Sequence, residues 1–166
     1  MREERDLYDI NSRLTGRTYF KGDPIPEGHY PMVVMIVIQN GKGEFLMQKR
    51  VPSKGGDWGV TGGHPKAGQS CKEGIITEAQ EELGIDISNQ QLEVFDWGCD
   101  GKDCYKMYYT MMDIPLESMK IQEEELTEVR WFSMSELNKM VETHELNPDQ
   151  IACFVKSTNY LSKKEL

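Results

Sequence analysis

The chain has little positive charge. Its 166 residues include 19 lysines and arginines against 28 aspartates and glutamates, so the formal net charge is −9 at pH 7. Proteins that bind nucleic-acid polymers without sequence preference neutralise phosphates with basic patches, so this composition argues against such a partner. A small phosphorylated ligand stays compatible with it, provided that a metal ion or a local basic cluster supplies positive charge.

Long apolar segments are also missing. The longest apolar run, MVVMIVI at 32–38, is far too short to cross a bilayer. The N-terminal stretch MREERDLYDI is charged and lacks the apolar core of a secretory signal. We therefore expect a cytoplasmic protein that has no membrane partner.

Cysteine is scarce as well. The four cysteines are Cys71, Cys99, Cys104 and Cys153, and in a cytoplasmic chain we expect them to be reduced thiols. Cys99 and Cys104 flank the loop CDGKDC and could form half of a zinc site. No second matched pair supplies the remaining two ligands, which argues against zinc.

The length favours one domain covering 1–166, without repeats or linkers. Residues 1–31 are rich in turn-forming sequences and predict an irregular N-terminal arm that could carry short strands. The run at 32–38 predicts a buried central strand, and FLMQKR at 45–50 predicts the strand that returns after the turn QNGKGE.

Helix signals follow a glycine-rich loop. Ser70 and Glu73 form a capping box that predicts a helix from about Cys71, and Gly84 is placed to end it. A second capping box and an Asn-Pro pair predict further helices over about 134–164. Helices placed between and after several strands predict an α/β or α+β layered domain with a mixed sheet.

The first predicted helix concentrates negative charge at its C-terminal end. Glu78, Glu81 and Glu82 fall within an arc of roughly 100° on a helical wheel. Like charges at i,i+4 destabilise a helix by about 0.2–0.5 kcal/mol, and the helix dipole disfavours them in the last turn. Either the three residues form an ordinary solvated acidic face, or they bind a hard cation such as Mg²⁺ or Mn²⁺.

The glycine-rich loop before the helix favours the cation site, because such loops let the backbone approach a phosphate or metal. Residues 62–85, GGHPKAGQSCKEGIITEAQEELGI, are very similar to the Nudix box, whose pattern is G-x5-E-x7-R-E-U-x-E-E-x-G-U with U aliphatic. The matching positions are Gly63, Glu78, Glu81, Glu82, Gly84 and Ile85, with the smaller Ala79 at the first aliphatic position. The chain thus resembles the Nudix hydrolase superfamily, with its box at 63–85.

Two positions depart from the family pattern. Gln69 stands where the family has a glutamate, and Thr77 stands where it has an arginine. The family residues are expected to form an ion pair that holds the loop on the helix. Replacing both partners by neutral groups can be nearly neutral in energy, and a polar contact between Gln69 and Thr77 could serve instead.

The resemblance implies a fold, a reaction and a cofactor. It covers roughly residues 32–140, including the later segment EEELTEVRWFSMSEL, and implies a Nudix-like α/β/α sandwich with a mixed central sheet. The implied reaction is the metal-dependent hydrolysis of a phosphoanhydride in a nucleoside diphosphate linked to another moiety. The implied cofactor is Mg²⁺ or Mn²⁺.

The resemblance also assigns the site residues. Glu78 and Glu82 are expected as metal ligands, with Glu81 as a further ligand or as the base that orients water. The Gly62 carbonyl is expected to complete the ligands. Glu125, in the acidic loop, is expected as a ligand or general base, with Glu123 and Glu124 as alternatives and a solvated loop as the ordinary interpretation.

Four residues are candidates for binding the diphosphate. Lys49 and Arg50 lie at a strand end beside the loop, where a solvated strand end is the competing interpretation. Gly63 lets the backbone approach the phosphates. His64 is either solvated or a phosphate contact.

Two other functions remain open. The arm and the GHP of the loop also resemble isopentenyl diphosphate isomerases, but Gly62 and Gly63 precede His64 where those enzymes use a cysteine. The neutral Gln69–Thr77 pair leaves room for a Nudix domain that senses a nucleotide without cleaving it. The sequence does not identify the substrate, and a homodimer is compatible with the arm but not required by anything in the chain.

Overall fold

A computed structural model of the chain describes residues 1–164, so the last two residues of the predicted domain 1–166 lie outside it. The strands are β1 (Glu4–Tyr8), β2 (Leu14–Phe20), β3 (Met32–Gln39), β4 (Phe45–Arg50), β5 (Trp58–Gly59), β6 (Thr61–Gly63), β7 (Glu93–Cys99), β8 (Cys104–Met111) and β9 (Leu126–Phe132). The helices are α1 (Cys71–Leu83), α2 (Met134–Glu142) and α3 (Pro148–Lys164), with short 3₁₀ helices η1 (Pro52–Lys54) and η2 (Leu116–Ser118).

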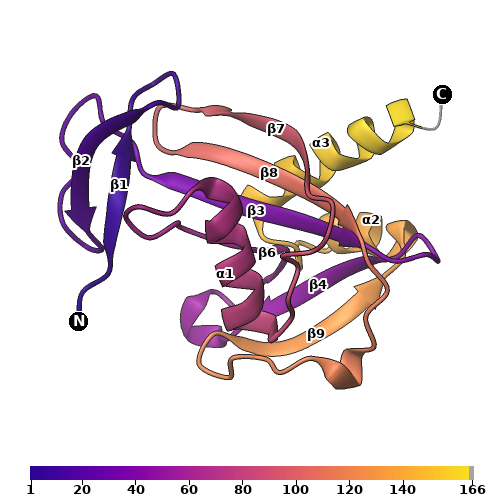
Figure 1. Cartoon of the computed structure of the whole chain (residues 1–166). Helices are drawn as coiled ribbons and strands as arrows, with labels where there is room; N and C mark the ends of the chain where they lie inside the picture. Colours follow the sequence, from indigo (N-terminus) through magenta and orange to yellow (C-terminus); the bar gives the residue numbers. More distant parts are fainter. Residues whose placement is uncertain (165–166) are drawn as a thin grey trace.

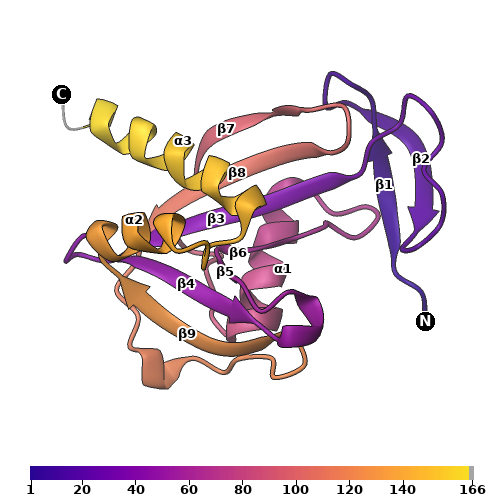
Figure 2. The ribbon, with the colours of Figure 1, turned by 180° about the vertical axis from the view of Figure 1, so that it is seen from behind.

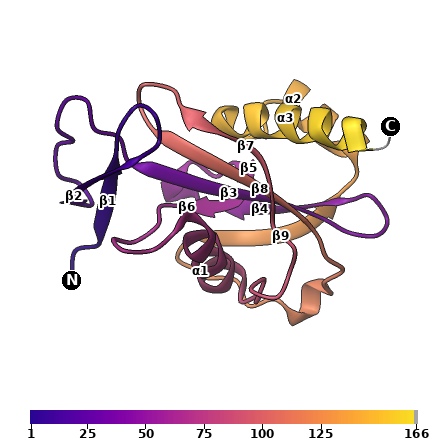
Figure 3. The same cartoon turned by 45° about the horizontal axis from the view of Figure 1, so that its top comes forward.

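The central sheet is mixed, as predicted. Its strands follow the order β5-β4-β3-β8-β7, with β6 also paired to β3 and β9 to β4. β3 and β8 are parallel, and the other strand pairs are antiparallel. α1 covers one face (Figure 1), and α2 and α3 cover the other (Figure 2). Figure 3 shows these three layers from another side, and they confirm the α/β/α sandwich.

β3 is the buried central strand that the apolar run predicted. Its alternate residues Val34 and Ile36 pack in the core cluster beneath α1, whereas Met35 and Val37 pack in the cluster beneath α2 and α3. Because a strand turns successive side chains to opposite faces, a strand covered on both faces must be apolar throughout. β3 therefore serves both halves of the core.

β3 and β4 form the predicted hairpin only at its tip, where Gln39 pairs with Phe45. Beyond the tip the two strands diverge, and β5 and β6 fill the gap. β6 pairs with β3 through Met35 and Gly62, and β5 pairs with β4 through Lys49 and Trp58. This split places the glycines of the loop in the sheet, directly beneath α1.

The N-terminal arm is more regular than the sequence predicted. β1 and β2 form a separate two-stranded antiparallel sheet beside the central one (Figure 1). Tyr8 and Tyr30 exchange two backbone hydrogen bonds of 2.8 Å. Near the start of β1, the amide of Ala67 donates a 2.8 Å hydrogen bond to the carbonyl of Glu4. The arm is thus attached to the glycine-rich loop.

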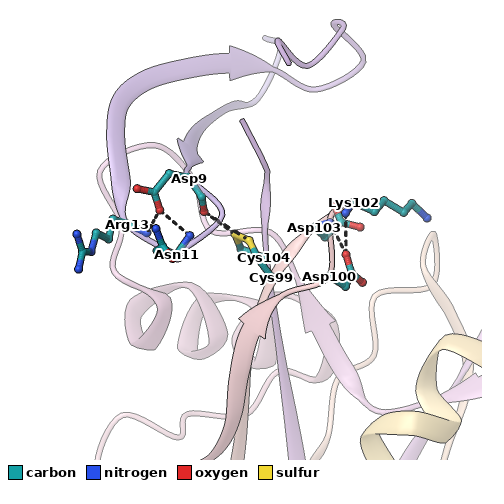
Figure 4. The surroundings of a disulfide bond; sticks show 8 residues. All are labelled: Asp9, Asn11, Arg13, Cys99, Asp100, Lys102, Asp103 and Cys104. Atoms are coloured by element: carbon teal, nitrogen blue, oxygen red, sulfur yellow. Dashed lines mark hydrogen bonds between the residues drawn. A yellow bond between two sulfur atoms is a disulfide. The ribbon is translucent and has the colours of Figure 1, made fainter. Parts of the chain in front are cut away.

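The expectation of four reduced thiols is wrong for one pair. Cys99 and Cys104 form a disulfide and lie directly opposite each other in the β7–β8 hairpin, with 4.0 Å between their Cα atoms. The sequence separation suggested a loop, but the hairpin turn brings the two residues into register. Both sulfur atoms contact the carbonyl oxygen of Asp9, at 3.5 and 3.3 Å (Figure 4). Cys71 and Cys153 are free.

Within residues 1–164, no helix is long and apolar enough to cross a membrane.

Candidate active site

α1 begins and ends as the sequence predicts. The Ser70 hydroxyl accepts a hydrogen bond from the Glu73 amide, and the Glu73 carboxylate accepts one from the Ser70 amide at 2.7 Å. Gly84 ends the helix in the left-handed conformation, with φ of 67°. Both ends of the helix are therefore fixed by local chemistry.

The two residues that depart from the Nudix pattern contact each other, as predicted. The Gln69 side-chain amide donates a 3.0 Å hydrogen bond to the Thr77 hydroxyl. The side-chain carbonyl oxygen of Gln69 accepts a second hydrogen bond, of 2.9 Å, from the Lys66 backbone amide. A neutral contact therefore joins the loop to the helix at the two positions that depart from the Nudix pattern.

Glu78 lies directly over the glycine-rich loop. A Cβ atom added to Gly63 would stand 2.2 Å from an oxygen of the Glu78 carboxylate. A Cβ atom added to Gly62 would stand 2.5 Å from the Val34 carbonyl oxygen. Both distances are far shorter than a nonbonded contact. A larger residue at position 62 would meet the backbone of β3, and one at position 63 would displace the Glu78 carboxylate. The missing side chain of Gly63 lets the Glu78 carboxylate approach the backbone of β6, and Gly62 lets β6 lie close to β3.

Glu82 is held by a residue that the sequence analysis missed. The Gln48 side-chain amide donates a 2.8 Å hydrogen bond to the Glu82 carboxylate. The Thr61 hydroxyl donates a 2.8 Å hydrogen bond to the other end of Gln48. Gln48 is only 5% exposed. A polar residue after three apolar ones in FLMQKR was the available signal, because its position in β4 places it on the face beneath α1.

The environment of these two carboxylates opposes ionisation. Burial raises the pKa of Glu78 to about 7, and the negative charges of Glu81 and Glu3 add to the shift. Burial likewise raises the pKa of Glu82 to about 7, assisted by the charges of Glu78 and Glu125 and opposed by the hydrogen bond from Gln48. Burial disfavours the charged form of a carboxylate, and a neighbouring like charge disfavours it further. A bound cation would relieve both effects.

Glu81 and Glu125 lie at the edge of this buried pair. Glu81 is half-exposed and its carboxylate forms a 2.8 Å ion pair with the Lys66 ammonium group. Glu125, just before β9, pairs with Lys54 of η1. Across residues 1–164, no three His, Cys, Asp or Glu side chains are close enough to hold a metal ion as they stand. Glu78 and Glu82 thus face the loop glycines, whereas Glu81 and Glu125 pair with lysines.

The donor set nevertheless suits a hard divalent ion. Within the described residues, neither Glu78 nor Glu82 forms an ion pair with a lysine or arginine. Two half-buried carboxylates beside the glycine backbone of β6 supply the oxygen ligands that Mg²⁺ and Mn²⁺ prefer.

The predicted phosphate-binding side chains have different environments in the structure. Arg50 is exposed at the end of β4. Lys49 lies 5.8 Å from the centre of the Trp58 ring, and Trp58 packs in the core cluster beneath α2 and α3. His64 is half-buried, and burial together with the positive charge of Arg5 lowers its pKa to about 4. His64 is therefore neutral at pH 7.

Arg5 of the arm is a second residue that the sequence analysis missed. Its side chain is only 11% exposed, and its Nε donates a 2.6 Å hydrogen bond to the Glu3 carboxylate. Burial is the main cause that raises the pKa of Glu78. The positive charge of Arg5 lowers that pKa. The arm thus brings a cation to the edge of the acidic site, and no sequence motif marks it.

Comparison with known proteins identifies the family. The sequence model of the NUDIX domain matches residues 29–152. An uncharacterized Nudix hydrolase of Listeria monocytogenes is 31% identical over 152 residues, covering 88% of this chain and 89% of the relative. A Nudix hydrolase of Listeria innocua matches equally well in identity and coverage. The chain belongs to the Nudix hydrolase family.

Solved structures share the fold at low sequence identity. The protein DR0079 of Deinococcus radiodurans has a TM-score of 0.77 at 19% identity, covering 93% of this chain and 98% of its own. The Nudix domain of Shewanella oneidensis NrtR, in complex with ADP-ribose, has a TM-score of 0.65 at 16% identity, covering 85% and 94%. A Caenorhabditis elegans Ap4A hydrolase has a TM-score of 0.59 at 18% identity, covering 80% and 98%.

Proposed function

We propose that this protein hydrolyses a phosphoanhydride in a nucleoside diphosphate linked to another moiety, using Mg²⁺ or Mn²⁺. The observation that carries the proposal is the half-buried carboxylate pair Glu78 and Glu82, which faces Gly62 and Gly63 at the centre of a Nudix domain. Such a pair destabilises the metal-free protein, and a divalent ion would remove the repulsion.

The nucleotide class of the substrate rests on two neighbours in fold. One was solved with ADP-ribose bound, and the other is named an Ap4A hydrolase. Both compounds carry a phosphoanhydride attached to a nucleoside. Because the identities are 16% and 18%, these neighbours suggest a class of substrate and not a particular compound.

The residues of the chain divide the work of the reaction. Glu78, Glu82 and the Gly62 carbonyl would hold the metal, and Glu125 would complete the set. Bound there, the ion would neutralise the phosphates and lower the pKa of a water ligand. Glu81 would orient or deprotonate the attacking water after leaving Lys66, with Glu125 as the alternative base.

The positively charged and loop residues would bind the substrate. Arg50 and the Gly63 backbone are the candidates, and Arg5 of the arm joins them. Neutral His64 would contact a phosphate only as a hydrogen-bond donor. Lys49 is the weakest of the predicted contacts, since its ammonium group lies over Trp58.

Product chromatography tests the proposal. The protein would be incubated with ADP-ribose, Ap4A, nucleotide sugars and nucleoside triphosphates, with Mg²⁺, Mn²⁺ or EDTA. We expect cleavage at a phosphoanhydride only with metal, lost in Glu82→Gln and kept in Glu73→Gln. Glu73→Gln is the matched control, because glutamine also completes a capping box. Metal-dependent cleavage that Glu82→Gln retains would overturn the role of the carboxylate pair.

A nucleotide sensor without catalysis is the second candidate. The observation that favours it is the neutral contact between Gln69 and Thr77, at the place where the family has charged residues. Tight binding of a panel compound without any cleavage would support the sensor. The isomerase alternative gains nothing from the two curated relatives, since both are named hydrolases. A cytoplasmic location, a homodimer and one domain over 1–166 stay predictions.

A further inference from the structure

A cavity of about 480 Å³ lies between the arm, the start of α1 and the β7–β8 hairpin. Three aromatic residues line it, namely Tyr8, Trp97 and Tyr105. Its polar lining residues include Ser12 and Lys106. Cavities of this size, with apolar walls and a few polar groups, are typical of sites for small molecules.

Trp97 stands out in the wall of this cavity. It is 60% exposed, whereas Trp58 is buried and Trp131 is half-buried. Trp97 pairs directly with Lys106 across β7 and β8, so the indole and the ammonium group lie on one face of the hairpin. This wall offers a flat aromatic surface beside a positive charge.

Ser12, in the turn between β1 and β2, supplies an unused polar group to the lining of the cavity. Its hydroxyl oxygen is buried and has no hydrogen-bond partner among residues 1–164. Its backbone is left-handed, with φ of 60°, which is uncommon for residues other than glycine. A buried hydroxyl without a partner costs stability, so a ligand that bonded to it would recover that cost.

The disulfide keeps the two walls together. Cys99 and Cys104 close the hairpin that carries Trp97, and their sulfur atoms contact the Asp9 carbonyl in the turn that carries Ser12 (Figure 4). The Asp9 carboxylate also accepts hydrogen bonds of 2.8 and 3.0 Å from the backbone amides of Asn11 and Arg13. The cavity is therefore preformed.

The cavity is in reach of the carboxylate pair. Cys71 lines the cavity, and Glu78 follows it on the same helix after almost two full turns. The two side chains thus leave the same side of α1, about 10 Å apart along its axis. A nucleotide spans this separation when its base lies in the cavity and its phosphates lie at Glu78.

We propose that this cavity binds the nucleobase of the substrate, which stacks on Trp97 and bonds to Ser12 and Lys106. The inference rests on the proposed function for the position of the phosphates. A nucleobase fits better than an aliphatic group, because it presents a flat π-face to the indole and polar edge atoms to the hydroxyl and ammonium groups.

Binding without hydrolysis tests the inference. ADP, GDP, CDP and UDP would be titrated into the protein in EDTA, with tryptophan fluorescence and calorimetry as readouts. We expect at least one of them to quench the fluorescence of the native protein. Trp97→Ala should bind it about 5- to 100-fold more weakly, which is about 1–3 kcal/mol at 1.4 kcal/mol per tenfold. Ser12→Ala should weaken the binding of the same nucleotide by a smaller factor.

Met111→Ala is the matched control, because Met111 is also 60% exposed on β8 but does not line the cavity. Inorganic pyrophosphate is the matched ligand, and Trp97→Ala should not change its binding. Equal binding of the nucleotide by Trp97→Ala and Met111→Ala would overturn the inference, as would the absence of nucleotide binding.

The two proposals fail separately. If the native protein binds a nucleotide through Trp97 but cleaves no panel compound with metal, the proposed base site is supported and the proposed hydrolase activity is overturned. If the native protein cleaves a panel compound and Trp97→Ala has the same KM for it, the proposed hydrolase activity is supported and the proposed base site is overturned.

Discussion

Two regions of α1 hold glutamates in opposite conditions. In the first turn, Glu73 accepts hydrogen bonds from Ser70, which lower the pKa of its carboxyl group. In the last two turns, burial raises the pKa values of Glu78 and Glu82 to about 7. The same side chain on the same helix is stabilised as an anion at one end and destabilised at the other.

The difference shows which part of the helix lowers the stability of the metal-free protein. Negative charge suits the N-terminal end of a helix dipole and conflicts with the C-terminal end, and the last turn of α1 has no basic residue. α2 has the same type of capping box but carries Lys139 in its last turn. Groups that destabilise the fold concentrate at functional sites, which supports the proposal that the last turns of α1 form the cation site.

The largest effect is expected for Glu82→Gln. A metal-bound carboxylate supports several kcal/mol of transition-state stabilisation, so hydrolysis should fall roughly a thousandfold. The metal-free variant should nevertheless unfold at a higher temperature than the native protein, since a buried charge is gone. Steady-state rates and thermal unfolding measure the two effects. Glu73→Gln should change neither by much, and an equal loss of activity there would break the comparison.

The next effect is expected for Gln48→Met, which keeps the size of the side chain and removes the hydrogen bond to Glu82. Loss of a group that orients a metal ligand costs about 10–100-fold in activity or metal affinity. The Thr61 hydroxyl also loses its partner, at about 1–3 kcal/mol of stability. Adding Thr61→Val should restore stability but not activity. Recovery of both would make Gln48 purely structural.

The pH dependence of stability should follow the raised pKa values. Unfolded glutamates titrate near pH 4.3, and Glu78 and Glu82 titrate at about 7 in the folded protein. Between these values the folded state holds protons that the unfolded state has released, so the stability of the metal-free protein should fall as pH rises. The two groups together should cost several kcal/mol of stability by pH 8, and their partial exposure to solvent reduces the loss. Urea unfolding in EDTA measures it, and a flat profile would contradict the buried pair.

The smallest effect is expected at the neutral contact in the loop. Gln69→Glu alone should destabilise the protein by about 1–3 kcal/mol, because Thr77 cannot neutralise the new charge. Adding Thr77→Arg recreates the charged pair of the family and should return stability to within about 1 kcal/mol of the native value. A double-mutant cycle measures the coupling. Additive losses would show that the loop does not accommodate the pair.

Local chemistry explains what the sequence predicts well. The capping box, the terminating Gly84 and the contact between Gln69 and Thr77 all join residues close together in the chain, and the structure confirms each. The alternation of β3 likewise follows from one short segment. The fold class and the family therefore follow from patterns that need no long-range information.

Long-range contacts explain what the sequence does not predict. Gln48 reaches Glu82 across 34 positions, through the split between β3 and β4. Arg5 reaches the site because β1 attaches to the loop at Ala67. The disulfide of Cys99 and Cys104 follows from the register of a hairpin, which spacing alone does not fix. Each case depends on how two distant segments pack.

The most direct test of the central claim is a calorimetric titration of Mn²⁺ into the metal-free protein at pH 8. The native protein, Glu82→Gln and Glu73→Gln would be compared under the same conditions. If the last turns of α1 form a cation site, the native protein and Glu73→Gln should bind Mn²⁺ with the same affinity, and Glu82→Gln should lose binding. Equal binding by all three proteins, or no binding by the native protein, would contradict the assignment of Glu78 and Glu82 as metal ligands.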